Sequence, residues 1–290
     1  MASLNPKILV IGVTGNIGCE VAKALIRRKV PFRAVVRTLA KVENLKKEGA
    51  DLVEIVEGDL NNLDSIAKAA EGIESVFLMT PPGQTHLGIP VGDTLKKAGV
   101  KRVVKLSGLG CDDGDKFLFA KEHLVVENHF KSIGLTYTSL RPSSFHSNWF
   151  QSAPSIKSKN QFANATRDGR KNFISNYDIG EFAAVVLTTE GHDGKEYNIT
   201  GPDNLTYTEA AAILSEVLGR KISYVGLSEE ENRKMAANFL PPQAIDGWVN
   251  MHQYFAAGGY DKSFDTLEKL TGSKGRTLKE FFTLNKPSFQ

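Results

Sequence analysis

The chain begins with a short apolar run that ends in three evenly spaced glycines. Residues 7–18 read KILVIGVTGNIG, and apolar residues continue at helical spacing from Ile17 to Leu25. This pattern predicts a buried strand, a glycine turn and a helix. Glycine adopts backbone angles that other residues resist and allows a ligand to approach closely. The first turn of a helix offers unpaired N–H groups that suit a phosphate. A dinucleotide is therefore the expected ligand.

The glycine spacing differs from the commonest dinucleotide-binding pattern, G-x-G-x-x-G. Gly12, Gly15 and Gly18 instead give G-x-x-G-x-x-G. A P-loop is excluded because Cys19 follows Gly18 where that motif requires lysine. A tight turn that binds nothing is the alternative. If the turn does bind a cofactor, the expected contacts are Gly12, Thr14, Gly15, Asn16, Ile17 and Gly18.

The bulk composition indicates an ordinary globular protein and excludes several classes of partner. A net charge of +3 without long runs of like charge gives no reason to expect direct nucleic-acid binding. Cys19 and Cys111 are too few for a disulfide framework, and no histidine or cysteine spacing indicates a metal. The first apolar run is too short to span a membrane. We expect a cytoplasmic protein with no metal and no membrane partner.

Apolar strand-like segments alternate with helix-like segments through the first half of the chain. The expected strands are 32–36, 52–56, 75–79, 102–106 and 135–140. The expected helices are 40–48, 63–70, 91–98 and 118–132. This alternation predicts an α/β fold with a doubly wound parallel sheet of the Rossmann type. Ligands of such sheets bind at the carboxyl ends of the strands.

The second half has a less regular pattern. Residues 151–172 are polar and turn-rich and predict a loop, whereas 178–187 predict a helix and 196–200 a strand. Thr206 and Glu209 have the spacing of a helix capping box. We expect residues 1–150 to form the cofactor-binding domain, with a strand and a helix from about 173–200 returning to it. Residues 151–172 and 201–290 would form a smaller, mainly helical substrate-binding lobe.

The end of the second predicted strand indicates which nucleotide is bound. NAD-binding folds carry an acidic residue there for the ribose 2′-hydroxyl, but this chain has Arg37. A guanidinium suits a 2′-phosphate, so the residue favours NADP(H) over NAD(H). A solvated strand-end cation is the alternative. Asp59 and Leu60, after the third strand, are candidates for contact with the adenine, although Asp-Leu-Asn-Asn is also common turn chemistry.

Taken in order, these segments resemble the NmrA-like family of atypical short-chain dehydrogenases, which has quinone-reductase-like and isoflavone-reductase-like members. The matching segments are residues 12–18, Arg37, 58–60, 106–107, 134–142, Phe145, Asn148, 178–180, 197–202, 218–219, Gly272 and 278–282. The resemblance covers nearly the whole chain. It implies a Rossmann fold that binds NADP(H). The family includes quinone reductases, a dye reductase and NADP-sensing regulators, so the resemblance implies fold and cofactor more firmly than activity.

The resemblance also points to residues after the later strands. Thr80 and Pro81 would flank the nicotinamide if the strand order is that of the family, although a rigid strand exit is the alternative. Ser107 follows the fifth strand and is a candidate hydrogen-bonding group. Pro142 and Phe145 stand where the family places nicotinamide contacts.

The catalytic pair of typical short-chain dehydrogenases, Tyr-x-x-x-Lys, is absent. Phe117 precedes Lys121 by four positions, and Phe119 precedes His123 by four. Phenylalanine exchanges no proton, so the usual mechanism does not apply. Water, the substrate, His123, with an ordinary pKa of ~6.5, or Lys121 would then supply the proton. An exposed or structural role is the alternative for both side chains.

The sequence therefore supports two functions. The first is an NADP(H)-dependent oxidoreductase that transfers hydride to a small, flat, conjugated or quinone-like acceptor without the tyrosine. The second is an NADP-binding redox sensor that acts through a protein partner. A homodimer is compatible with either.

Overall fold

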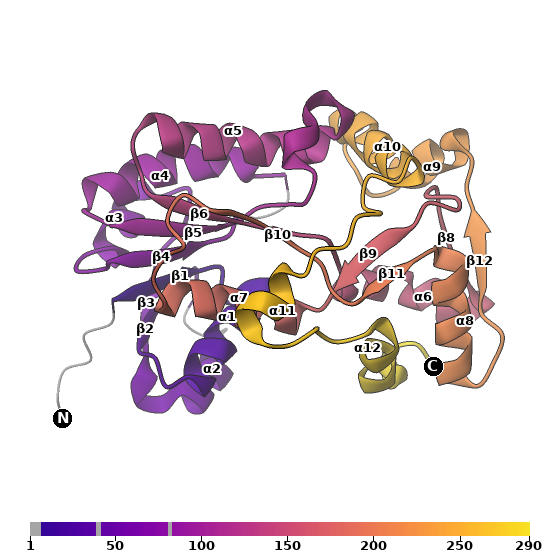
Figure 1. Cartoon of the computed structure of the whole chain (residues 1–290), viewed down its shortest axis with the longest axis horizontal. Helices are drawn as coiled ribbons and strands as arrows, with labels where there is room; N and C mark the ends of the chain where they lie inside the picture. Colours follow the sequence, from indigo (N-terminus) through magenta and orange to yellow (C-terminus); the bar gives the residue numbers. More distant parts are fainter. Residues whose placement is uncertain (1–6, 39–41, 81–82) are drawn as a thin grey trace. The chain divides into compact units, whose positions relative to one another are not determined.

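In the computed structural model the chain divides into two units, and residues 7–38, 42–80 and 83–290 are described (Figure 1). The first unit comprises the chain up to Gly108 together with 122–141 and 176–197; the second comprises 109–121, 142–175 and 198–290. The boundaries differ from those expected from the sequence. Residues 109–121 and 142–150 belong to the second unit because the chain leaves the main sheet after its fifth and sixth strands.

A seven-stranded sheet dominates the first unit. Its strands are β1 (Ile8–Ile11), β2 (Phe32–Val36), β3 (Val53–Glu57), β4 (Ser75–Leu78), β5 (Arg102–Leu106), β6 (Tyr137–Pro142) and β10 (Glu196–Ile199). Their order is β10-β6-β5-β4-β1-β2-β3. The pairings from β3 to β6 are parallel, with Ile8 opposite both Phe32 and Ser75. The prediction of a doubly wound parallel α/β sheet is confirmed.

Helices cover both faces of this sheet. They are α1 (Asn16–Arg27), α2 (Glu43–Gly49), α3 (Leu63–Ala69), α4 (Gly88–Lys97), α5 (Leu118–Ser132) and α7 (Asn176–Thr188). Figure 1 shows α3, α4 and α5 over one face and α1 and α7 over the other. The helices α1 and α7 pack closely because Gly180 has no Cβ, which would lie 2.6 Å from the backbone of Glu20. Leu9, Val76, Leu95, Val126 and Phe130 contribute to the core on the α4–α5 side.

The second unit contains two small sheets and several helices. The first sheet has the order β11 (Asp203–Leu205), β9 (Lys171–Ile174), β7 (Ser144–Phe145); the second pairs β12 (Ser223–Gly226) with β8 (Gln161–Asn164). The helices are α6 (Ala153–Lys159), α8 (Tyr207–Leu218), α9 (Glu229–Ala236), α10 (Pro242–Ala256), α11 (Thr266–Thr271) and α12 (Leu278–Leu284). Short 3₁₀ turns occupy 50–52, 85–87, 111–116, 146–152 and 286–288.

The prediction of a loop at 151–172 was wrong, because this segment contains α6, β8 and the start of β9. Its few apolar residues are core residues: Ile156 and Phe162 are buried, and Phe162 meets Trp149 edge-on at 4.9 Å between ring centroids. The capping box predicted at Thr206 and Glu209 is confirmed. None of the described helices is both long and apolar enough to cross a membrane.

Candidate functional site

Each glycine of the first turn contributes to the geometry of the turn in a different way. Gly12 has a φ of +97°, which favours glycine. The N–H of Gly15 donates to the carbonyl of Gly12 at 2.9 Å, which closes the turn. A Cβ on Gly18 would lie 2.1 Å from the carbonyl oxygen of Gly12, so only glycine lets α1 pack this closely on the turn. Among the residues that the structure describes, no side chain caps α1 at Gly15, and the positive end of a helix suits an anion.

Gly18→Ala is expected to destabilise the protein by about 1–3 kcal/mol, because the methyl group collides with a backbone carbonyl that cannot rotate away. The affinity for NADPH should fall by about tenfold or more as the turn opens. Thermal unfolding and calorimetric titration measure the two effects. Gly247→Ala is the matched control, since a Cβ there meets no atom within 4 Å. A Gly18→Ala variant as stable as this control would contradict the proposed packing.

The side chain of Met79 also packs against the glycine turn, a contact that the sequence did not predict. Met79, directly after β4, places its Cε 2.7 Å from where a Cβ of Gly15 would lie and 2.9 Å from that of Gly12. The thioether therefore occupies the space that side chains at these positions would fill. Thr80 follows Met79 and is half-buried. Pro81 lies outside the described residues.

Arg37 and Asp59 follow β2 and β3. Arg37 is exposed. Asp59 accepts hydrogen bonds from the backbone N–H of Asn61 at 2.9 Å and from its side-chain amide at 3.0 Å. These bonds lower the pKa of Asp59, and the charge of Arg37 adds a smaller effect. Asp59 thus makes the hydrogen bonds of a turn, the role that the sequence offered as the alternative to contact with adenine. Leu60 packs on the hydrophobic core.

Ser107 belongs to a buried polar network at the end of β5. Its hydroxyl donates to Glu127 at 2.5 Å, as does that of Ser139, and the guanidinium of Arg141 pairs with the same carboxylate at 2.5 Å. Burial alone would raise the pKa of Glu127, but the bonds from Arg141, Ser107 and Ser139 outweigh it, and the pKa lies below its ordinary value. A hydroxyl that donates to Glu127 cannot donate to a ligand at the same time.

His123 lies on α5, half-buried, with its Nδ1 3.0 Å from the Nζ of Lys105. Burial, and then the charge of Lys105, lower the pKa of His123 well below its ordinary 6.5. The imidazole is therefore neutral near pH 7, and the ordinary pKa that recommended it as an acid does not apply. Lys105 was missed by the sequence reasoning. The available signal was a lysine inside the apolar strand Arg-Val-Val-Lys-Leu.

The remaining predicted site residues belong to the second unit. Lys121 is exposed, and its backbone N–H donates to Phe117 at 3.1 Å. Pro142 ends β6, and its carbonyl accepts from Leu109 at 3.0 Å. Phe145 is half-buried at the end of β7, opposite Ile174. The structure thus brings the glycine turn and Met79 together within the first unit, and places Arg37 near Asp59 there.

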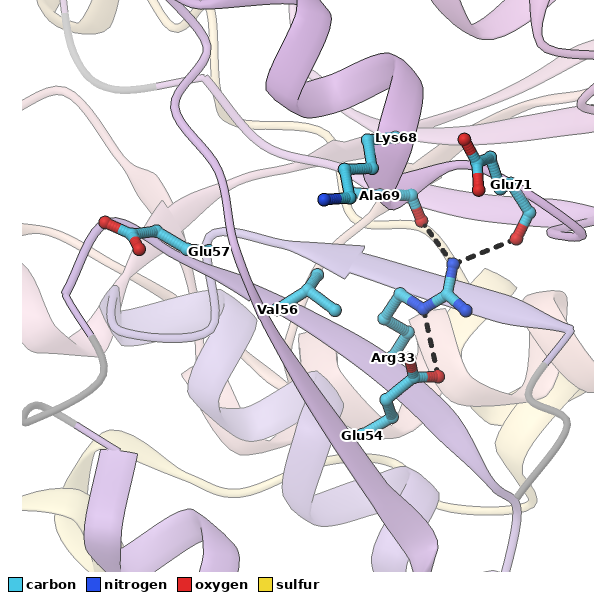
Figure 2. Close-up of a pocket in the computed structure, with 7 residues that line it drawn as sticks. All are labelled: Arg33, Glu54, Val56, Glu57, Lys68, Ala69 and Glu71. Carbon is cyan, nitrogen blue, oxygen red and sulfur yellow. Dashed lines mark hydrogen bonds and ion pairs between the residues drawn. The ribbon is translucent and has the colours of Figure 1, made fainter. Parts of the chain in front are cut away.

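A pocket of about 380 Å³ at the β2–β3 edge of the sheet contains none of the predicted residues (Figure 2). The guanidinium of Arg33 lines this pocket and donates to the carbonyls of Ala69 at 2.7 Å and Glu71 at 2.9 Å. It also pairs with the carboxylate of Glu54 at 3.0 Å. These bonds satisfy carbonyls at the end of α3, which is a structural role. Among the residues that the structure describes, no cluster of metal-ligating side chains occurs.

Known proteins resemble this chain along almost its whole length. It is 31% identical to an NAD(P)H azoreductase of Xenophilus azovorans, over 97% of this chain and 99% of that protein. The solved structure of an Escherichia coli NADPH-dependent quinone oxidoreductase with NADPH has a TM-score of 0.86 and 29% identity, covering 96% of this chain and 99% of the other. A Citrobacter triphenylmethane reductase with NADP(H) gives a TM-score of 0.83 and 28% identity, with coverages of 96% and 99%.

An isoflavone reductase shares the fold at 19% identity, with a TM-score of 0.77 and coverages of 98% and 100%. The family model described as NmrA-like matches residues 5–286. The glycine turn, the parallel sheet that carries it and the network around Glu127 lie inside this match, which covers most of both units. The chain belongs to the NmrA-like family.

Proposed function

We propose that this protein is an NADPH-dependent oxidoreductase that transfers hydride to a small, flat, conjugated acceptor such as a quinone or an azo compound. The observation that carries the proposal is the close-packed glycine turn at the uncapped start of α1, with a Cβ of Gly18 excluded by the carbonyl of Gly12. The relatives named above reduce quinones, azo compounds or triphenylmethane dyes with nicotinamide cofactors, which supports this acceptor class.

The residues of the first unit fit a dinucleotide. The backbone of residues 12–18 would hold the pyrophosphate against the N-terminus of α1. Arg37 would contact the 2′-phosphate, and Thr80 would lie on the nicotinamide side. Once bound, NADPH supplies the hydride. The protein then contributes binding, orientation and exclusion of competing reactions, which account for much of the acceleration in such a transfer.

Arg37→Glu is expected to reverse the cofactor preference. A charge-assisted hydrogen bond contributes about 1.5–3 kcal/mol, so the affinity for NADPH should fall roughly 10- to 100-fold while that for NADH changes little. Calorimetric titration with both nucleotides measures this. Lys131→Glu makes the same charge change at an exposed position of α5 and serves as the control. Equal losses for both cofactors would place Arg37 outside the 2′-phosphate contact.

The activity itself is tested by NADPH oxidation against a panel of quinones, azo dyes, enones and imines. Turnover of quinones or azo dyes is the expected result. The proposed reaction proceeds without the usual tyrosine, because phenylalanine stands four positions before both Lys121 and His123. One of the two, Phe117, stacks on Tyr254 at 4.5 Å between centroids within the second unit. Tight NADPH binding with no turnover of any acceptor would overturn the oxidoreductase and favour a redox sensor that acts through a protein partner.

A further inference from the structure

A lysine lies in the middle of the main sheet. Lys105 is only 1% exposed, and Val103, Val104 and Leu106 around it on β5 are buried apolar residues. A buried ammonium group is costly unless its hydrogen atoms find acceptors. Its acceptors include the ring nitrogen Nδ1 of His123 at 3.0 Å and the carbonyl oxygen of Leu106 at 3.3 Å.

The first contact fixes the position of the imidazole proton. An ammonium group has only hydrogen-bond donors, so Nδ1 of His123 must accept with its lone pair. A neutral imidazole carries one ring proton, and that proton must then reside on Nε2. Burial and the charge of Lys105, the two influences that lower the pKa of His123, both keep the ring neutral. Lys105 therefore selects one tautomer of His123.

The ring edge that carries Nε2 lies beside the turn after β5. A Cβ on Gly108 would be 3.8 Å from Cδ2 of His123, the carbon bonded to Nε2. Gly108 follows Ser107 at the carboxyl end of the strand, where parallel sheets of this type bind their ligands. Nδ1 is thus engaged by Lys105, while the opposite edge of the ring lies at the ligand-binding end of the sheet.

We propose that Lys105 is a positioning residue that holds His123 as the Nε2–H tautomer, and that His123 donates this proton to the acceptor during its reduction. The proposal rests on the proposed function. Addition of a hydride, which NADPH would supply when bound, would leave an oxygen or nitrogen anion on the acceptor. The Nε2 proton passes to that anion, and an Nζ proton of Lys105 passes to Nδ1. After product release, Nε2 regains a proton from solvent at the ligand-binding end, and the Nδ1 proton returns to the neutral amine of Lys105, which restores both groups. This relay supplies the proton that the absent tyrosine would otherwise provide.

The tautomer is tested directly by ¹⁵N NMR of histidine-labelled protein, without and with NADP⁺, with the His123 signals assigned through His123→Gln. In the wild type near pH 7, Nε2 should be protonated and Nδ1 unprotonated. Lys105→Met should give a mixture of tautomers, and Lys105→Arg should restore the Nε2–H form. A wild-type ring that is protonated on Nδ1, or that titrates near its ordinary pKa, would overturn the assignment.

The proton transfer is tested by kinetics on the same variants. Lys105→Met should lower kcat by about 10- to 100-fold and enlarge the solvent isotope effect, with the affinity for NADPH unchanged. Lys101→Met, whose side chain is 70% exposed just before β5, is the control. Removing a buried charge should leave Lys105→Met at least as stable as the wild type, so loss of fold will not explain a slower reaction.

The two hypotheses fail in different ways. A wild-type protein that reduces no acceptor refutes the proposed function and the donation step together, whereas the NMR spectra still decide whether Lys105 sets the tautomer. A wild-type enzyme that turns over normally, with a Lys105→Met variant of unchanged kcat, refutes the relay and leaves the proposed function intact.

Discussion

Replacing Arg141 by methionine is expected to lower the free energy of unfolding by about 3–5 kcal/mol, because it leaves a buried carboxylate without its cation. Arg141 and Glu127 are almost completely buried, with side chains 2% and 1% exposed, and their charged groups are 2.5 Å apart. Glu196, on β10, pairs with Arg141 at 3.0 Å but is 42% exposed and can turn to solvent. Urea-induced unfolding of the wild type and the variant measures the difference.

The response to pH identifies the carboxylate as the cause. In the wild type the pKa of Glu127 lies below its ordinary value, so its stabilising contribution is present above about pH 4.5 and is lost as the pH falls further. Without Arg141, burial should raise that pKa above the unfolded value. The variant should then regain stability, relative to the wild type, as the pH falls toward about 4.5.

The double variant Glu127→Gln with Arg141→Met is the control for this interaction. Removing both charges should recover most of the loss, since a buried ion pair is often replaceable by neutral groups at little cost. A double variant no more stable than Arg141→Met alone would assign the loss to packing around the guanidinium, and not to the charge left on Glu127.

The local patterns of the sequence predicted the architecture of the first unit well. The β1 run, the glycine turn and the helix residues Ile17, Val21 and Leu25 were all recognisable, because each pattern is completed within a few turns of chain. The second unit was less predictable. Its sheets pair strands that are distant in sequence, such as Gln161 with Ser223, and each strand has at most four residues. Strands this short carry almost no periodicity.

The candidate site likewise has parts formed by one continuous segment and parts formed by residues distant in sequence. The glycine turn was predictable because it is one continuous segment. The partners of Ser107 and His123 were not, because Glu127, Arg141 and Lys105 reach them from other elements of the fold. Ser107 was expected to contact a ligand, yet its proton is donated to Glu127. His123 was chosen for an ordinary pKa that Lys105 and burial remove. Spacing along the chain thus indicates a candidate group, but its protonation state depends on tertiary contacts.

The second large effect is expected at Lys171, where replacement by methionine should stabilise the protein. Lys171 lies on β9 and is buried; its Nζ is 3.8 Å from the centroid of Phe255 and 3.5 Å from the hydroxyl of Tyr207. Burial lowers its pKa to about 7. A difference of this size from the ordinary lysine value corresponds to a cost on the order of 5 kcal/mol for burying the charge. The cation–π contact with Phe255 offsets about 2 kcal/mol of this cost.

The stabilisation at Lys171 should depend on pH in a defined direction. Below about pH 7 the folded amine is charged and the cost is complete; between about 7 and 10.5 the unfolded state binds more protons, so the wild type gains stability with rising pH. Near pH 6 the free energy of unfolding of Lys171→Met should therefore be about 2–3 kcal/mol higher than that of the wild type, after the lost cation–π contact is subtracted. The difference should shrink toward pH 10.5. His252 titrates nearby. Burial lowers its pKa to about 4, the charge of Lys171 contributes to that lowering, and the variant should raise this pKa.

Lys221→Met, at an exposed position, is the control. A Lys171→Met variant that is less stable at every pH would mean that the contacts with Phe255 and Tyr207 outweigh the cost of burial.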